Sequence, residues 1–162
     1  MNRRVFLTLG ATISVASAFF GFFGKKREDK WRLLQSVQNH LFPKNPPFPD
    51  AESIGSVRYL KMVSRDPSFD REDLAFIFEG IEIVREKGFR TTLPDEEKER
   101  ILRDFARTPF GENWISLVLN YTFEALLSDP IYGGNFHQKG WKSLHHRPGK
   151  PRPKVPFARI VS

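Results

Sequence analysis

The sequence predicts an all-α protein in which about five helices pack as an irregular bundle. Five stretches between Trp31 and Leu127 carry apolar residues at intervals of three and four, the spacing of one helix face. No stretch alternates with the period of two that a half-buried strand requires. Proline and glycine clusters separate the stretches. A chain of 162 residues with 16 phenylalanines is long enough to bury a core as one domain.

A proline-rich connector separates the first two predicted helices. The first follows Trp31 and ends before the connector, which runs from Pro43 to Pro49. The second is expected from Asp50 to Val63, where Ser64-Arg65-Asp66-Pro67 stops it. The inward residues are Trp31, Leu34, Val37, Gln38, Leu41, Ile54, Val57 and Leu60. His40, in the last turn of the first helix, is interpreted as a residue facing the helix dipole rather than as a ligand.

Three further helices follow, each with its own start and stop signal. Asp70 is expected to cap the third helix, with Asp73 in place of the usual Glu of a capping box, and Gly88 to end it. Pro94 and the acidic residues after it begin the fourth. Thr108-Pro109-Phe110-Gly111 separates the fourth helix from the fifth, which is the longest and most apolar. The inward residues are Leu74, Ile77, Phe78, Ile81, Val84, Ile101, Leu102, Phe105, Trp114, Leu117, Val118, Tyr121, Ala125 and Leu126.

A sharp bend follows the fifth helix, from Ser128 to Asn135. Pro130 excludes a helical conformation at the residue before it, so the helix should end near Ser128. Gly133-Gly134 is expected to occupy backbone regions closed to residues with a Cβ, and Asn135 tolerates the left-handed region. Tyr132 and Trp141 flank the bend, which on local physics alone is an ordinary turn or, as an alternative, a ledge for a ligand.

The charge distribution divides the chain into a leader (1–24), a helical body (25–142) and an extended tail (143–162). The net charge is +7, and all charged residues from Phe136 onward are basic. The tail is also rich in proline, so it should be extended and free to lie along a partner like a strap, burying Phe157, Ile160 and Val161. A basic tail commonly indicates nucleic-acid binding. No recognition helix accompanies this one, so no nucleic-acid partner is predicted.

The leader resembles a twin-arginine export signal. An arginine pair directly precedes the apolar run from Val5 to Gly24, and Ala16-Ser17-Ala18 has the small-x-small pattern that a signal peptidase accepts. The export residues are Arg3, Arg4, Phe6 and Leu7, and the cleavage residues are Ala16 and Ala18. The run is also long enough, at ~1.5 Å per residue, to span the ~30 Å hydrocarbon layer as an uncleaved anchor. The sequence leaves cleavage and anchoring open.

The sequence offers little that supports chemistry. It has no cysteine, which excludes disulfides, thiolate metal sites and covalent haem c attachment. It has no glycine-rich phosphate cradle and no nucleophile elbow. His137, His145 and His146 lack a nearby carboxylate, so their geometry for a metal is poor. We predict a chain that is not itself an enzyme, with no catalytic, cofactor-binding or metal-binding residue.

The bend carries a second resemblance. Asp-Pro-x-Tyr-Gly-Gly-Asn, followed by Gly-Trp-Lys, resembles the signature of the gluconate 2-dehydrogenase small-subunit family, also called subunit 3. Where that family often shows Asp-Gly, this chain has Phe136 to Lys139. The likeness extends more loosely over the helices from Trp31 onward. The residues in register are Asp129, Pro130, Tyr132, Gly133, Gly134, Asn135, Gly140, Trp141 and Lys142.

The resemblance implies a cofactor-free small subunit of a membrane-associated dehydrogenase. Its partners would be a large FAD-containing subunit acting on CH–OH groups, usually a c-type cytochrome with haem c, and the twin-arginine translocase. The bend residues would contact the flavoprotein, and the complex would lie in the periplasm at the inner membrane. The alternative is a stand-alone exported helical binding protein, or a membrane-anchored adaptor whose leader and basic tail hold it to anionic lipid. The substrate of the complex stays open.

Overall fold

The computed structural model describes residues 28–153 and residue 155. Helices and turns account for the regular structure of this part, apart from a single antiparallel bridge between Asn45 and Phe48. The all-α prediction is confirmed there. The predicted export and cleavage residues (Arg3, Arg4, Phe6, Leu7, Ala16 and Ala18) lie outside the described residues, as do Phe157, Ile160 and Val161.

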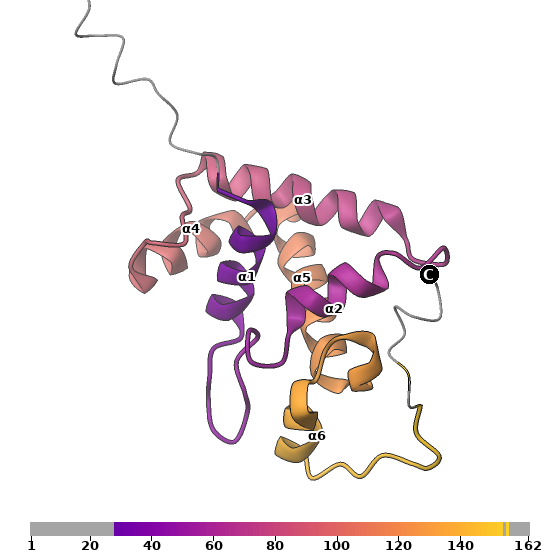
Figure 1. Cartoon of the computed structure of the whole chain (residues 1–162). Helices are drawn as coiled ribbons and strands as arrows, with labels where there is room; N and C mark the ends of the chain where they lie inside the picture. Colours follow the sequence, from indigo (N-terminus) through magenta and orange to yellow (C-terminus); the bar gives the residue numbers. More distant parts are fainter. Residues whose placement is uncertain (1–27, 154, 156–162) are drawn as a thin grey trace, which may run out of the picture.

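Six α-helices and two short 3₁₀ helices make up the described fold (Figure 1). Helix α5 is central: it packs against α1, α2, α3, α4 and α6. In Figure 1, α3 crosses the top of the molecule and α6 lies at the bottom. The helices are α1 (Lys30–Leu41), α2 (Ser56–Val63), α3 (Arg71–Glu86), α4 (Asp95–Ala106), α5 (Pro109–Leu127) and α6 (Lys139–Ser143), and the 3₁₀ helices are η3 (Pro130–Tyr132) and η4 (Phe136–Gln138).

The predicted helix starts hold, with three corrections. Helix α5 already begins at Pro109, so Pro109, Phe110 and Gly111 form its first turn rather than a break before it, and only Thr108, its N-cap, lies outside. The Asp70 side chain accepts from the Glu72 amide at 2.8 Å and caps α3, as expected. Asp73 does not complete a capping box, because its carboxylate accepts from the Tyr121 hydroxyl of α5 at 2.6 Å and joins the two helices. Helix α2 begins at Ser56 rather than at Asp50.

The late start of α2 has a local cause. The Asp50 carboxylate accepts from the Ser53 amide at 2.6 Å and holds this segment in turns. Gly55, the N-cap residue, then adopts a left-handed conformation with φ of 78°, and α2 begins at the next residue. A Cβ at Gly55 would lie 2.8 Å from the ring of Phe136, so this glycine also lets η4 approach α2 closely.

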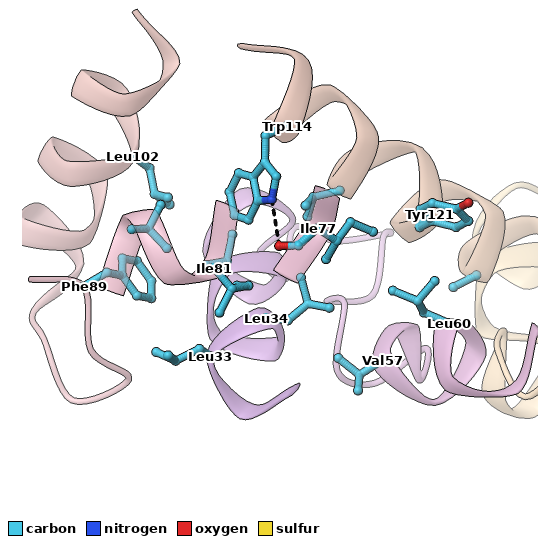
Figure 2. Close-up of a cluster of buried hydrophobic side chains, with 14 of the residues drawn as sticks. Leu33, Leu34, Val57, Leu60, Ile77, Ile81, Phe89, Leu102, Trp114 and Tyr121 are labelled. Carbon is cyan, nitrogen blue, oxygen red and sulfur yellow. Dashed lines mark hydrogen bonds between the residues drawn. The ribbon is translucent and has the colours of Figure 1, made fainter. Parts of the chain in front are cut away.

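Trp114 is the largest fully buried side chain of the core (Figure 2). Its indole N–H donates to the Ile77 carbonyl of α3 at 3.0 Å. The indole occupies the space above Gly80, where any Cβ would overlap the ring. Figure 2 shows Ile77 and Ile81 of α3 beside Trp114, with Leu102 of α4 also close. Helix α3 and helix α5 are therefore fixed against each other by a tryptophan seated over a glycine.

A buried polar chain joins α1, α2 and α5. The Ser56 hydroxyl donates to the Gln38 side-chain oxygen at 2.8 Å, and the Gln38 amide donates to the Thr122 hydroxyl at 3.0 Å. Thr122 in turn donates to the Val118 carbonyl at 2.8 Å. All three side chains are almost fully buried, and these bonds satisfy polar groups that would otherwise be costly inside the core.

Two tyrosines join α5 to its neighbours α2 and α3 through hydrogen bonds to carboxylates. Burial, reinforced by the hydrogen bond to Asp73, raises the pKa of Tyr121 above its ordinary value. Burial also raises the pKa of Tyr59, and the nearby Glu124 carboxylate, which accepts from its hydroxyl at 3.1 Å, adds to the rise.

None of the helices in the described residues combines the length and the apolar character that crossing a membrane requires.

We predict that Gly80→Ala destabilises the protein. Alanine at an exposed helix position would gain about 1 kcal/mol over glycine. Here the added methyl overlaps the Trp114 indole, and overpacking of this kind costs about 1–3 kcal/mol. Urea unfolding should therefore show a lower free energy of unfolding for the variant. In a Trp114→Leu background the same substitution should cost less, and an equal cost in both backgrounds would contradict the seating of Trp114 over Gly80.

Candidate functional site

The candidate site is built around the carboxyl end of α5. The last carbonyls of a helix have no partner within the helix, so they must find donors elsewhere. Helix α5 ends at Leu127, and Ser128 and Asp129 turn to extended conformations, as Pro130 predicts. The chain from Asp129 to Lys142 then folds back over this end through η3, η4 and α6. We call this segment the α5 cap.

Asp129 begins the α5 cap and organises its first turn. One carboxylate oxygen accepts from the Ile131 amide at 3.1 Å, which caps η3. The Tyr132 amide donates to the Asp129 carbonyl at 3.0 Å, and Pro130 fits the first position of η3. Tyr132 is half-buried and packs against the hydrophobic core.

The two adjacent glycines are required for different reasons. Gly133 has a φ of 87°, the left-handed conformation that the sequence predicts. Gly134 does not have a left-handed φ, so that part of the prediction is wrong. Its constraint is close packing, because a Cβ there would lie 2.6 Å from the Ala125 carbonyl oxygen of α5.

Asn135 is the central polar residue of the α5 cap. Its side chain is fully buried, and its backbone is left-handed with φ of 46°. Its amide nitrogen donates to the Ser128 carbonyl at 3.0 Å, and its amide oxygen accepts from the Gly140 N–H at 2.8 Å. One side chain therefore satisfies the end of α5 and the start of α6 together.

Gly140 and Trp141 close the cap from α6. A Cβ at Gly140 would overlap the Leu126 carbonyl oxygen, so only glycine lets α6 lie this close to α5. The Trp141 indole donates to the Leu127 carbonyl at 2.7 Å, and the side chain is 7% exposed. The bend is thus a folded unit with its own helix rather than an ordinary turn, and sequence reasoning missed α6 because five residues carry too little periodicity.

The first part of the basic tail returns to the α5 cap. Arg152 donates to the second carboxylate oxygen of Asp129 at 2.8 Å, and its guanidinium lies 4.6 Å from the centre of the Trp141 ring. The His146 amide donates to the Trp141 carbonyl at 2.8 Å. In the described residues, the tail is therefore held against the body by Arg152, a contact that composition alone does not predict.

The outer surface of the α5 cap meets α2 on one side. Phe136 is half-exposed, and the Arg58 guanidinium lies 4.9 Å from the centre of its ring. Its amide donates to the Ile54 carbonyl at 3.3 Å. Ile131 and Tyr132 are half-exposed as well. Ile131 and Phe136 lie outside the predicted partner-binding set. Within that set, Asp129, Pro130 and Tyr132 are partly exposed, whereas Gly133, Gly134, Asn135, Gly140 and Trp141 are buried.

The histidines of this region do not form a metal-binding group. Within residues 28–153, no three His, Asp, Glu or Cys side chains converge as metal ligands would. His145 and His146 line a surface hollow with Leu127, Trp141 and Leu144. His40, in the last turn of α1 as expected, lies 3.0 Å from Glu99 of α4 and pairs with it rather than with the helix end alone. This contact and the Arg103 pair lower the pKa of Glu99.

Comparisons with protein-family models, with curated proteins and with solved structures found no match to this chain.

We predict that Asn135→Ala lowers the free energy of unfolding by about 2–4 kcal/mol. The substitution leaves the buried Gly140 amide without its partner, at about 1–3 kcal/mol, and the partly exposed Ser128 carbonyl without its donor, at about 1 kcal/mol. Asn120→Ala on the exposed side of α5 is the matched control and should stay within about 0.5 kcal/mol of wild type in the same urea titration. Equal stability of the two variants would contradict the role of Asn135.

We predict that Arg152 and Asp129 are energetically coupled. In a double-mutant cycle, Arg152→Ala and Asp129→Asn should show a coupling of about 0.5–1 kcal/mol that weakens in high salt, because asparagine keeps the acceptor for Ile131 and loses only the charge. The control is a second double-mutant cycle that combines Arg147→Ala with Asp129→Asn, for which we expect no coupling. A coupling for Arg152 no larger than this control would show that the tail is not held by the ion pair.

Proposed function

We propose that this chain is the non-catalytic small subunit of a membrane-associated, FAD-dependent dehydrogenase of the gluconate 2-dehydrogenase kind. In this proposal it carries the folded flavoprotein through twin-arginine export and then stabilises it in the periplasm. The observation that carries the proposal is the α5 cap. Four residues of the resembling motif have separate roles in one folded unit. Gly134 and Gly140 let the chain approach α5 closely, Asn135 bridges the end of α5 and the start of α6, and Trp141 donates to the Leu127 carbonyl.

The α5 cap supports the proposal because its residue pattern is a structural requirement. A run of turn-forming residues arises easily by chance, since many turns accept Gly, Asn and Pro. A buried Asn placed to meet a Gly-Trp pair from the next helix is much more restrictive. The pattern that resembles the family therefore specifies a particular way of ending a central helix, and family members that share the pattern would share this unit.

The motif region contains both buried and exposed residues, and the exposed ones suggest where a flavoprotein would bind. The buried members build the α5 cap and cannot contact a partner without unfolding it. Ile131, Tyr132 and Phe136 present apolar and aromatic surface beside Arg58. Aromatic and arginine side chains are the residues that interfaces favour. We assign the flavoprotein contact to this surface, with the α5 cap as the rigid support behind it.

The leader, together with a sequence that carries no cofactor motif, is consistent with a chain that accompanies a cofactor-containing partner through export. The twin-arginine pathway exports proteins that are already folded, usually because a cofactor was inserted in the cytoplasm. FAD and the oxidation of the CH–OH group would belong to the large subunit, and a quinone or a cytochrome carrying haem c would receive the electrons. This chain would supply the export signal and a docking surface, with no nucleic-acid partner.

A second candidate is a stand-alone exported or membrane-anchored helical binding protein. The surface hollow lined by Leu127, Trp141 and Leu144 favours it, because it offers apolar surface beside the bend. The two candidates differ in what accompanies the full chain on purification from its native source. The subunit proposal requires a flavoprotein with its absorbance spectrum, and the binding-protein candidate requires none.

We predict that Arg3→Lys with Arg4→Lys strands two proteins in the cytoplasm. Lysine keeps the charge of the pair but cannot reproduce the planar, multiply donating guanidinium that a receptor reads. This chain and a leaderless FAD dehydrogenase should both disappear from the periplasmic fraction, as followed by antibody after cell fractionation. The flavoprotein should keep activity with an artificial dye in the cytoplasmic fraction, while respiratory oxidation of its substrate falls.

The matched control makes the same change outside the signal, at Arg27 and Arg32. Export should continue there, because these arginines lie after the apolar run. A flavoprotein that reaches the periplasm in normal amount in the signal variant would overturn the escort mechanism. Retention of this chain alone would favour the second candidate.

A further inference from the structure

Large exposed apolar side chains gather at one end of the molecule. Phe123 and Leu127 lie four residues apart on the outer face of α5, and they are 44% and 51% exposed. Leu144, which is 45% exposed, lines the same hollow as Leu127. Phe48 of the connector is 37% exposed. Among the described residues, Val155 of the tail is the one other exposed large apolar side chain.

Two observations bring these side chains to the same end of the molecule. A second hollow is lined by Phe48 and its proline neighbours on one side, and by Lys139, Lys142 and Ser143 of α6 on the other. The ring of Phe123 packs edge-on against Phe42, directly before the connector, with 5.6 Å between the ring centres. Figure 1 shows the connector loop and α6 reaching the same end of the molecule. We call this surface the basic apolar end.

The charged side chains that line the two hollows are mostly basic, with Lys44, Lys139, Lys142 and Arg147 against the one carboxylate of Asp50. Lys44, Lys139 and Lys142 are exposed around the second hollow. Arg147, His145 and His146 line the first. The carboxylate in the second hollow, Asp50, already accepts from the Ser53 amide. The two carboxylates nearest in sequence to Leu127 are also engaged, Glu124 with Tyr59 and Asp129 with Arg152.

This composition fits a lipid surface better than a protein partner. Protein interfaces are also enriched in phenylalanine, but they are depleted in lysine, which is the main charged residue around this surface. Surfaces that lie in the membrane interface combine phenylalanine and leucine with flanking lysines. The headgroups of anionic lipids carry negative charge, which is complementary to Lys44, Lys139, Lys142 and Arg147. Each basic residue near such a surface strengthens binding about fivefold.

We propose that the basic apolar end docks on the surface of an anionic lipid bilayer. Phe48, Leu127 and Leu144 enter the headgroup region, and Lys44, Lys139 and Lys142 lie at the phosphates. The contact comes from the folded body and needs neither the leader nor the end of the tail. It also does not rest on the flavoprotein proposal, because the surface beside Phe136 adjoins α2 and shares none of these side chains.

The absence of cysteine allows a direct test with the full chain. Leu144→Cys carries an environment-sensitive fluorophore, and Glu97→Cys on the exposed side of α4 is the matched control. Each labelled protein is mixed with phosphatidylglycerol-containing vesicles and with pure phosphatidylcholine vesicles. Because the label reports its own surroundings, insertion of the leader does not by itself change the signal at residue 144.

The expected result is a blue shift and a rise in emission at residue 144 with anionic vesicles only, with no change at residue 97. Lys139→Glu with Lys142→Glu should weaken the titration at least about tenfold, because two attractive charges become repulsive. High salt should weaken it as well. An equal response at both positions, a response to neutral vesicles of the same size, or a response only to an added protein partner would overturn the proposal.

Discussion

The rest of the structure depends on how the carboxyl end of α5 is satisfied. Helix α5 contacts the five other α-helices of the described fold, so its position sets theirs. Its last carbonyls have no donors within the helix. The Leu127 carbonyl accepts from the Trp141 indole and the Ser128 carbonyl accepts from the Asn135 amide. Loss of either donor would leave a polar group unsatisfied at the end of the central helix, at about 1–3 kcal/mol.

The same requirement explains why the motif has glycine at positions 134 and 140. Donors from a folded-back segment reach the helix end only if the backbones approach closely, and Gly134 and Gly140 provide that approach against Ala125 and Leu126. At the other end of α5, Trp114 uses Gly80 of α3 in the same way. The central helix is therefore fixed at both ends by a tryptophan that donates to a backbone carbonyl beside a glycine.

The sequence predicts what local rules decide and misses what distant partners decide. The five long helices, the cap at Asp70 and the left-handed glycines at 88 and 133 follow from periodicity and turn chemistry. The role of Asp73, the Gln38–Thr122 bond and the return of Arg152 to Asp129 each require a partner from another part of the chain. The motif residues were found, but their burial was not, because a pattern in sequence does not show which face of a bend packs inward.

The α5 cap gives the two proposed surfaces a common support. On one side η3 and Phe136 lie against α2, where Arg58 meets the aromatic ring. On the other side α6 meets the proline-rich connector and presents its lysines. Both surfaces are held by the same three groups, Asn135, Gly140 and Trp141, so a change that opens the α5 cap should disturb protein docking and lipid docking together. A change in the side chains of one surface, such as Leu144 or Phe136, should leave the other intact. That difference separates damage to the support from damage to either contact.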